Sequence, residues 1–136
     1  MKAIVIYESL LGTTRKLSHL IAAELEARGI ATTVCNITNI DLDALSNAYL
    51  VFVGTWTDGI FVTAQKPGRA GRIQTMPALT GKKTIGFVTY ALHPGKVAER
   101  LVKLLEWRKA EVIGALEVRR DKLEVGAAEV VHYGLE

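Results

Sequence analysis

The sequence predicts an α/β protein with a doubly wound, five-stranded parallel sheet of strand order 2-1-3-4-5. Short runs of apolar, β-branched residues alternate with segments of helical periodicity, which is typical of βαβ units with right-handed crossovers. The apolar runs are almost continuous, as expected where helices cover both faces of a parallel sheet. The chain has 136 residues, 49% of them hydrophobic and 23% charged, which fits one folded domain over residues 1–136.

Strands and helices alternate along the chain. The predicted strands lie at residues 3–7, 31–36, 49–53, 83–89 and 111–118. Clear helices are predicted at residues 14–28 and 94–109, and in the first of these Leu17 and Ile21 belong to one apolar stripe. Thr13 is a suitable N-cap for it. The sequence predicts only a short helix at residues 41–47, and residues 54–79 are expected to form a long loop with at most a short helix near its end.

The C-terminal segment, residues 119–136, has the weakest periodicity. Gly126 interrupts it, so we expect a short or irregular C-terminal helix. An incomplete helix would leave an apolar patch on the sheet, which a second copy of the chain could cover. A monomer and a homodimer are therefore both kept open.

The composition argues against several classes of protein. No apolar run approaches the ~18 residues of a membrane span, and the N-terminus has the wrong flanks for a signal peptide. Cys35 is the only cysteine, so neither an internal disulfide nor a multi-cysteine metal site is expected. Residue spacing indicates no metal site and no Ser-His-Asp arrangement, so no catalytic residue is assigned. We expect a cytoplasmic protein that does not bind membranes.

The net charge of +3 is concentrated in a central segment. Residues 59–98 contain six of the 17 basic residues and no Asp or Glu. Lys66, Arg69 and Arg72 within it have two interpretations: a solvated loop, or a docking surface for an acidic protein or an anionic substrate. Nucleic acid is not expected as a partner, because the basic run lacks interleaved aromatic residues.

The loop after the first strand, residues 8–14, is a candidate phosphate site. A sheet of this kind binds ligands beyond the carboxyl ends of its strands, where the strand order reverses. The loop contains Ser9, Gly12, Thr13 and Thr14 and leads directly into a helix, whose N-terminal N–H groups attract anions. The alternative is a simple N-cap turn. The loop lacks the Gly-Lys-Ser/Thr of a Walker A motif and any GxGxxG.

Two aromatic residues follow the strands that neighbour this loop in the predicted sheet. Trp56 lies in the loop after the third strand, and Tyr90 begins the loop after the fourth. Both are suitably placed to stack on a flat ring. The alternative is that they only cover the end of the sheet.

These residues resemble those of short-chain flavodoxins over about residues 1–118. The family's Ser/Thr-x-Thr-Gly-x-Thr phosphate loop corresponds to the run from Ser9 to Thr14, in which Leu11 replaces one hydroxyl residue and Thr13 could take its place. The Gly-x-Trp-x-Asp string from Gly54 to Asp58 is similar to a subset of the family.

The resemblance implies FMN as the cofactor, with its phosphate on the first loop and its ring between Trp56 and Tyr90. A glycine at Gly59 would let the backbone turn over beside the ring. The Asp58 carboxylate would disfavour the second reduction of the flavin. The residues expected to contact FMN are Ser9, Leu10, Leu11, Gly12, Thr13, Thr14, Thr55, Trp56, Thr57, Asp58, Gly59, Tyr90, Ala91 and His93.

Three functions agree with this pattern. The first is an FMN-binding electron carrier whose redox partner, an acidic protein, docks on Lys66, Arg69 and Arg72. The second is an FMN-dependent reductase acting on a small anionic or quinone-like substrate. The third is a flavin-free scaffold that binds proteins, because fold alone does not fix function. The carrier is the favoured interpretation, and enzymatic activity is left open.

Overall fold

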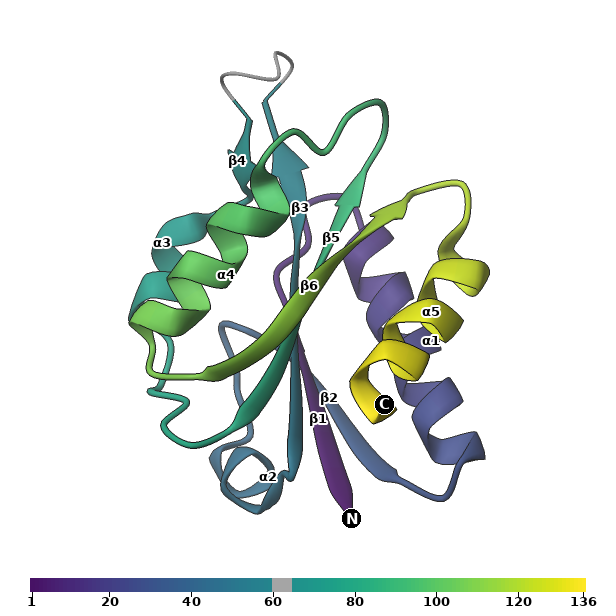
Figure 1. The fold of residues 1–136 in the computed structure, drawn as a ribbon, viewed down its shortest axis with the longest axis vertical. Helices are drawn as coiled ribbons and strands as arrows, with labels where there is room; N and C mark the ends of the chain where they lie inside the picture. The colour runs from purple at the N-terminus through teal and green to yellow at the C-terminus, as the bar shows by residue number, and fades with distance from the viewer. Residues whose placement is uncertain (60–64) are drawn as a thin grey trace.

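The computed structural model describes residues 1–59 and 65–136, and its centre is a parallel β-sheet (Figure 1). The long strands pair in the order β2-β1-β3-β5-β6, which confirms the predicted order 2-1-3-4-5. A two-residue strand, β4 (Lys66–Pro67), pairs antiparallel with β3. The bounds of the long strands are β1 Lys2–Tyr7, β2 Ala31–Asn36, β3 Leu50–Asp58, β5 Lys83–Tyr90 and β6 Glu111–Arg119.

Helices cover both faces of this sheet (Figure 1). The helices α1 (Thr13–Ala27) and α5 (Leu123–Leu135) pack on one face. The opposite face is covered by α2 (Leu42–Asn47), α3 (Ala70–Thr75) and α4 (Val97–Trp107). None of the helices in residues 1–59 and 65–136 is both long and apolar enough to cross a membrane.

Alternation along the central strands explains why both faces are apolar. On β1, Val5 points into the core beneath α1 and α5, while Ile4 and Ile6 point to the other core. All three side chains are fully buried. Each contributes about 1.5–3 kcal/mol by burial. Because both faces of such a strand are buried, nearly all of its residues are apolar. This explains the near-continuous apolar run in the sequence.

The third strand is longer than the sequence predicts. A loop was expected from Gly54, but β3 continues to Asp58. Pairing with β5 extends to Trp56, which faces Thr89, and the last two residues pair with β4. Gly54 suits this strand because a Cβ there would overlap the ring of Phe87.

The C-terminal helix is more regular than expected. Residues 123–135 form a 13-residue helix despite Gly126. The reason is close packing, because a Cβ at Gly126 would overlap the side chain of Val118 on β6. Val130 and Val131 are fully buried against the sheet. The incomplete helix that would have favoured a homodimer is therefore not found.

Candidate functional site

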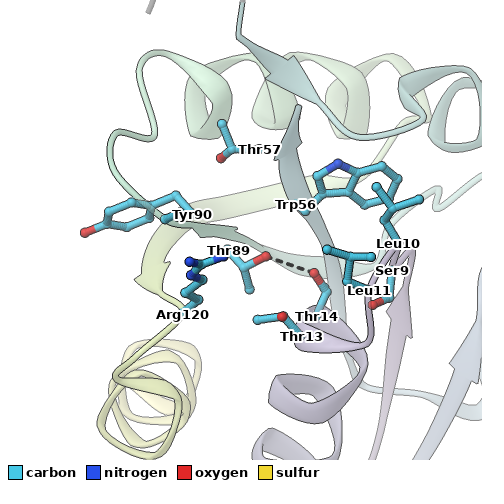
Figure 2. Close-up of a pocket in the computed structure, with 11 residues that line it drawn as sticks. Ser9, Leu10, Leu11, Thr13, Thr14, Trp56, Thr57, Thr89, Tyr90 and Arg120 are labelled. Atoms are coloured by element: carbon cyan, nitrogen blue, oxygen red, sulfur yellow. Dashed lines mark hydrogen bonds between the residues drawn. The ribbon is translucent and has the colours of Figure 1, made fainter. Parts of the chain in front are cut away.

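A pocket opens at the carboxyl ends of β1, β3 and β5, where the switch-point rule places a ligand (Figure 2). It brings together residues from the loop after β1, the end of β3, the end of β5 and the loop after β6. Its lining consists of Ser9, Leu10, Leu11, Thr13, Thr14, Trp56, Thr57, Thr89, Tyr90, Ala91 and Arg120. Nine of the residues predicted from the sequence are in this list.

One end of the pocket is the N-terminus of α1. Gly12 has a φ of 94°, so the chain turns there through a conformation that favours glycine, and α1 begins at Thr13. The N–H of Gly12 donates to Ser9 Oγ at 3.1 Å, which leaves the hydroxyl proton of Ser9 free to donate to a ligand. The first N–H groups of α1 have no partner within the helix. This end of the pocket is therefore suited to an anion.

Thr14 has a different role from the one its position in the motif suggests. Its hydroxyl lies 2.9 Å from that of Thr89, and both side chains are buried (Figure 2). This hydrogen bond ties the start of α1 to the end of β5. Thr13 is only half-buried at the pocket surface, so its hydroxyl is the more available of the two.

The other end of the pocket is formed by Trp56. A Cβ at Gly68 would overlap the indole, so the 68–69 turn packs directly on Trp56. The Gly68 N–H donates to the Trp56 carbonyl at 2.8 Å, and the Arg69 guanidinium lies 5.6 Å from the ring centroid. Cation–π attraction at this distance contributes about 0.5–1 kcal/mol. The indole is held between this turn and the pocket.

A buried carboxylate fixes that turn in place. Glu8, directly after β1, is only 1% exposed and accepts from Arg69 Nη1 at 2.7 Å. Arg72 Nη1 donates to both of its carboxylate oxygens, at 2.9 and 2.8 Å. We call these three residues the Glu8 clasp. It connects the start of the loop after β1 with the turn behind Trp56, and it engages two of the three cations predicted as a docking surface.

Thr57 supplies a test of whether a ligand fits. Its Oγ1 is buried, has no hydrogen-bond partner among residues 1–59 and 65–136, and belongs to a residue that lines the pocket. A buried polar group without a partner costs about 1–3 kcal/mol. A ligand with a polar edge beside Trp56 would remove that cost. The pocket thus suits a molecule with an anionic end, a flat ring and polar atoms on the ring edge.

Five predicted residues are absent from the pocket lining. Gly12 lines an adjoining hollow, and Gly59 directly follows β3 with a φ of 108°. The Thr55 hydroxyl is buried and donates to the Gly68 carbonyl at 2.7 Å. Asp58 pairs with Lys66 in the β3–β4 ladder. His93 is exposed, and its carbonyl accepts from Gln65 at 2.6 Å.

Sequence reasoning did not identify two lining residues, Thr89 and Arg120. The backbone N–H of Arg120 donates to the Tyr90 carbonyl at 2.9 Å, which fixes the loop after β6 beside the pocket. Its guanidinium points toward Thr89 (Figure 2). In the described part of the chain it forms no ion pair, whereas its neighbour Arg119 pairs with Asp121. The switch-point rule applied to the last strand would have found it.

The fold and the pocket define a doubly wound α/β protein with a ligand site at the switch point between β1 and β3. The family model for flavodoxin matches residues 5–134, so the chain belongs to the flavodoxin family. Flavodoxins are flavin-binding electron-transfer proteins that usually carry FMN and donate electrons to partner proteins.

Solved structures with the same fold include free-standing flavodoxins and parts of larger proteins. A flavodoxin from the domain Archaea is 18% identical, with a TM-score of 0.70 and 100% of both chains covered. Flavodoxin 1 from Bacillus cereus is 22% identical, with a TM-score of 0.67 and 97% and 98% of the two chains covered. For the flavodiiron protein from Giardia intestinalis the identity is 17% and the TM-score 0.70, over 98% of this chain and 35% of that one. No curated protein matches the sequence.

Proposed function

We propose that this protein binds FMN in the pocket between β1, β3 and β5 and carries electrons between redox proteins. The observation that supports this is one pocket that combines a hydroxyl-lined helix N-terminus with an indole and an unpartnered hydroxyl beside it. FMN has the matching groups, an anionic phosphate and a flat ring with polar edges. FMN supplies the redox chemistry by reversibly accepting electrons, and the protein tunes its potential.

At the phosphate end, Ser9 and Thr13 would donate hydroxyl hydrogen bonds, and the first N–H groups of α1 would add their own. Thr14 would act mainly by holding α1 against β5 through Thr89. Arg120 would balance part of the phosphate charge from the loop after β6. Gly12 would contribute through the turn that starts the helix.

At the ring end, Trp56 and Tyr90 would stack on the flavin and the Thr57 hydroxyl would bond its polar edge. Leu10 and Leu11 are 56% and 87% exposed at the mouth of the pocket. Bound FMN would cover them, and their burial would add to its affinity while excluding water from the ring. Asp58 would act on the potential through its charge from outside the lining.

An FMN-dependent reductase is the second candidate, and Arg120 favours it. A guanidinium without a carboxylate partner beside the pocket could also hold an anionic substrate. Turnover with NAD(P)H and quinones would distinguish the two functions, because a carrier needs a protein donor. The flavin-free scaffold is less well supported, since it gives no reason for the unpartnered Thr57 hydroxyl.

The proposal includes a cytoplasmic location and an acidic redox partner. Lys66 lies beside the ring end of the pocket, because β4 pairs with the last residues of β3. Arg69 and Arg72 lie behind Trp56, are each a little over 40% exposed, and leave the Glu8 clasp with a net positive charge. A surface of this sign would attract an acidic protein, and the attraction would weaken at high salt. The choice between a monomer and a homodimer stays open.

An absorbance scan tests the proposal directly. The purified protein is measured before and after addition of FMN and desalting. We expect retained flavin bands near ~375 and ~450 nm. Trp56→Ala should lose them, while Trp107→Phe, which changes the other tryptophan, should keep them. A colourless wild-type protein that does not retain FMN would contradict both the carrier and the reductase.

A further inference from the structure

A second hollow lies on the face of the molecule formed by α3, α4 and β4, away from the cofactor pocket. Its floor is apolar and includes Pro67, Leu104 and Trp107. Leu104 and Trp107 lie on one side of α4, together with Arg100 and Lys103, because residues spaced three and four apart share a helix face. We call this hollow the α4 groove.

The floor of the α4 groove includes one large apolar side chain that is exposed. The Trp107 side chain is 69% exposed at the last turn of α4. Exposed apolar patches with a polar rim are typical of surfaces that bind another protein. Tryptophan is also among the residues that contribute most to the affinity of protein interfaces.

All the charged residues that line the α4 groove are cationic. Lys66, Arg100 and Lys103 line it, and no Asp or Glu does. None of the three forms an ion pair within the described residues, and residues 60–64 contain no acidic side chain. The two carboxylates of α4, Glu99 and Glu106, are exposed outside the groove.

We propose that the α4 groove is the docking site for an acidic redox partner. An apolar side chain of the partner would lie on Trp107 and Leu104, and its carboxylates would face Lys66, Arg100 and Lys103. Charge complementarity selects this partner, since a basic or neutral protein would leave three cations facing no counter-charge. That the partner exchanges electrons rests on the proposed carrier function, but the predicted binding of an acidic protein does not depend on FMN.

The position of the α4 groove relative to the pocket suits electron transfer. β4 forms one wall of the groove, and it pairs with Thr57 and Asp58 at the end of β3. The turn that follows β4 packs on Trp56. A partner in the groove therefore lies one short strand away from the ring end of the pocket. The cations of the groove have no carboxylate partner in the described residues, although Arg100 donates to the Gln65 carbonyl, whereas Arg69 and Arg72 already bind Glu8.

The test uses a plant-type [2Fe–2S] ferredoxin, an acidic one-electron protein, as the probe, with basic cytochrome c as the opposite-charge probe. Binding is measured by isothermal titration calorimetry at low and high salt. We expect the ferredoxin to bind at low salt. The double variant Lys103→Glu, Trp107→Ser should weaken that binding about tenfold or more, because it removes a rim charge and the exposed anchor. Lys2→Glu, a matched charge reversal at the exposed first residue of β1, should leave it unchanged.

Each outcome has a defined meaning. Failure of the wild-type chain to bind ferredoxin at low salt, or equal weakening by Lys2→Glu, would overturn the proposal. Tighter binding of cytochrome c than of ferredoxin by the wild type would do the same. Two further results would also overturn it. One is that the double variant abolishes dimerisation seen in sedimentation but leaves ferredoxin binding unaffected. The other is that it abolishes binding to vesicles containing phosphatidylserine and again leaves ferredoxin binding unaffected. FMN retention is measured on the same samples, so failure of the carrier function is seen separately from failure of docking.

Discussion

The two ends of the proposed FMN pocket, here called the phosphate end and the ring end, are built in different ways. The phosphate end is a run of six consecutive residues, from Ser9 to Thr14, at the start of one helix. The ring end brings Trp56 together with Gly68 and Arg69, and Arg69 is held by the Glu8 carboxylate, 61 positions earlier in the chain. The first is local and uses backbone N–H groups, whereas the second depends on tertiary packing and one buried charge.

This difference predicts different tolerance to mutation. Loss of one hydroxyl at the phosphate end leaves the helix N–H groups and the other donors in place. Loss of one contact at the ring end should move the indole. Trp56 packs on Gly68 and Arg69, and Arg69 is in turn held by Glu8. Substitutions behind Trp56 should therefore have larger effects than substitutions in the phosphate loop.

The largest effect is expected from Gly68→Val. A side chain there overlaps the indole and must displace Trp56. Ring stacking is worth about 1–3 kcal/mol, so FMN affinity should fall by about 5- to 150-fold, as measured by fluorescence titration. Gly71→Ala is the matched control, because no atom lies within 4 Å of the added methyl. Unchanged affinity in a folded Gly68→Val protein would show that the indole position does not matter.

Glu8→Gln should have the next largest effect. Gln keeps the shape of the side chain but removes the charge that Arg69 and Arg72 share. We expect a loss of about 1–3 kcal/mol in the free energy of unfolding. The loss should lie toward the lower end of this range, because both arginine side chains are partly exposed and water screens their charges. Urea denaturation measures this loss. Increased protease cleavage near the β4 turn should accompany it, and full stability with an unchanged digestion pattern would exclude the clasp as a support.

Arg120→Gln sharpens the comparison from the phosphate side. Removing one cation near the phosphate should weaken FMN binding by about 0.3–1 kcal/mol. The salt dependence of FMN affinity should also decrease, whereas riboflavin affinity should hardly change. Arg119→Gln, which affects the neighbouring exposed arginine that pairs with Asp121, is the control. An equal loss for FMN and riboflavin would place Arg120 at the ring instead.

The smallest effect is expected from Asp58→Asn. The residue is half-buried at the end of β3 and lies outside the pocket lining. Loss of its negative charge should raise the potential of the second reduction, since the ring gains negative charge in that step. Spectroelectrochemical titration of the FMN-loaded protein measures it. An unchanged potential would restrict Asp58 to pairing with Lys66 in the β3–β4 ladder.

The parts of the structure that the sequence predicted are those with local causes. The positions of the long strands and of the two main helices follow from apolar periodicity, and the strand order follows from the topology that alternating strands and helices favour. The phosphate loop follows from a strand, a short polar run and a helix start. The length of β3 does not follow from a local pattern. Residues 55–58 have the polar sequence of a loop, and they form a strand because β5 and β4 pair with them.

Other features depend on contacts that no local pattern contains. Gly126 weakens the helical periodicity of the C-terminal segment. A glycine suits this position because any larger side chain would overlap Val118. The Glu8 clasp pairs residues 61 and 64 positions apart, and nothing beside Glu8 in the sequence indicates those partners. Arg120 was accessible to sequence reasoning, because it follows the last strand at the same edge of the sheet as the predicted loops.

The most direct test of an FMN pocket with these two ends is a titration that follows Trp56 alone. In Trp107→Phe, Trp56 is the only tryptophan in the chain. We predict that FMN quenches its emission saturably at one FMN per chain and that riboflavin, which lacks the phosphate, binds at least about tenfold more weakly. Glu8→Gln in this background should weaken both ligands and leave their ratio unchanged. Absence of saturable quenching, or equal affinity for FMN and riboflavin, would contradict the proposed site.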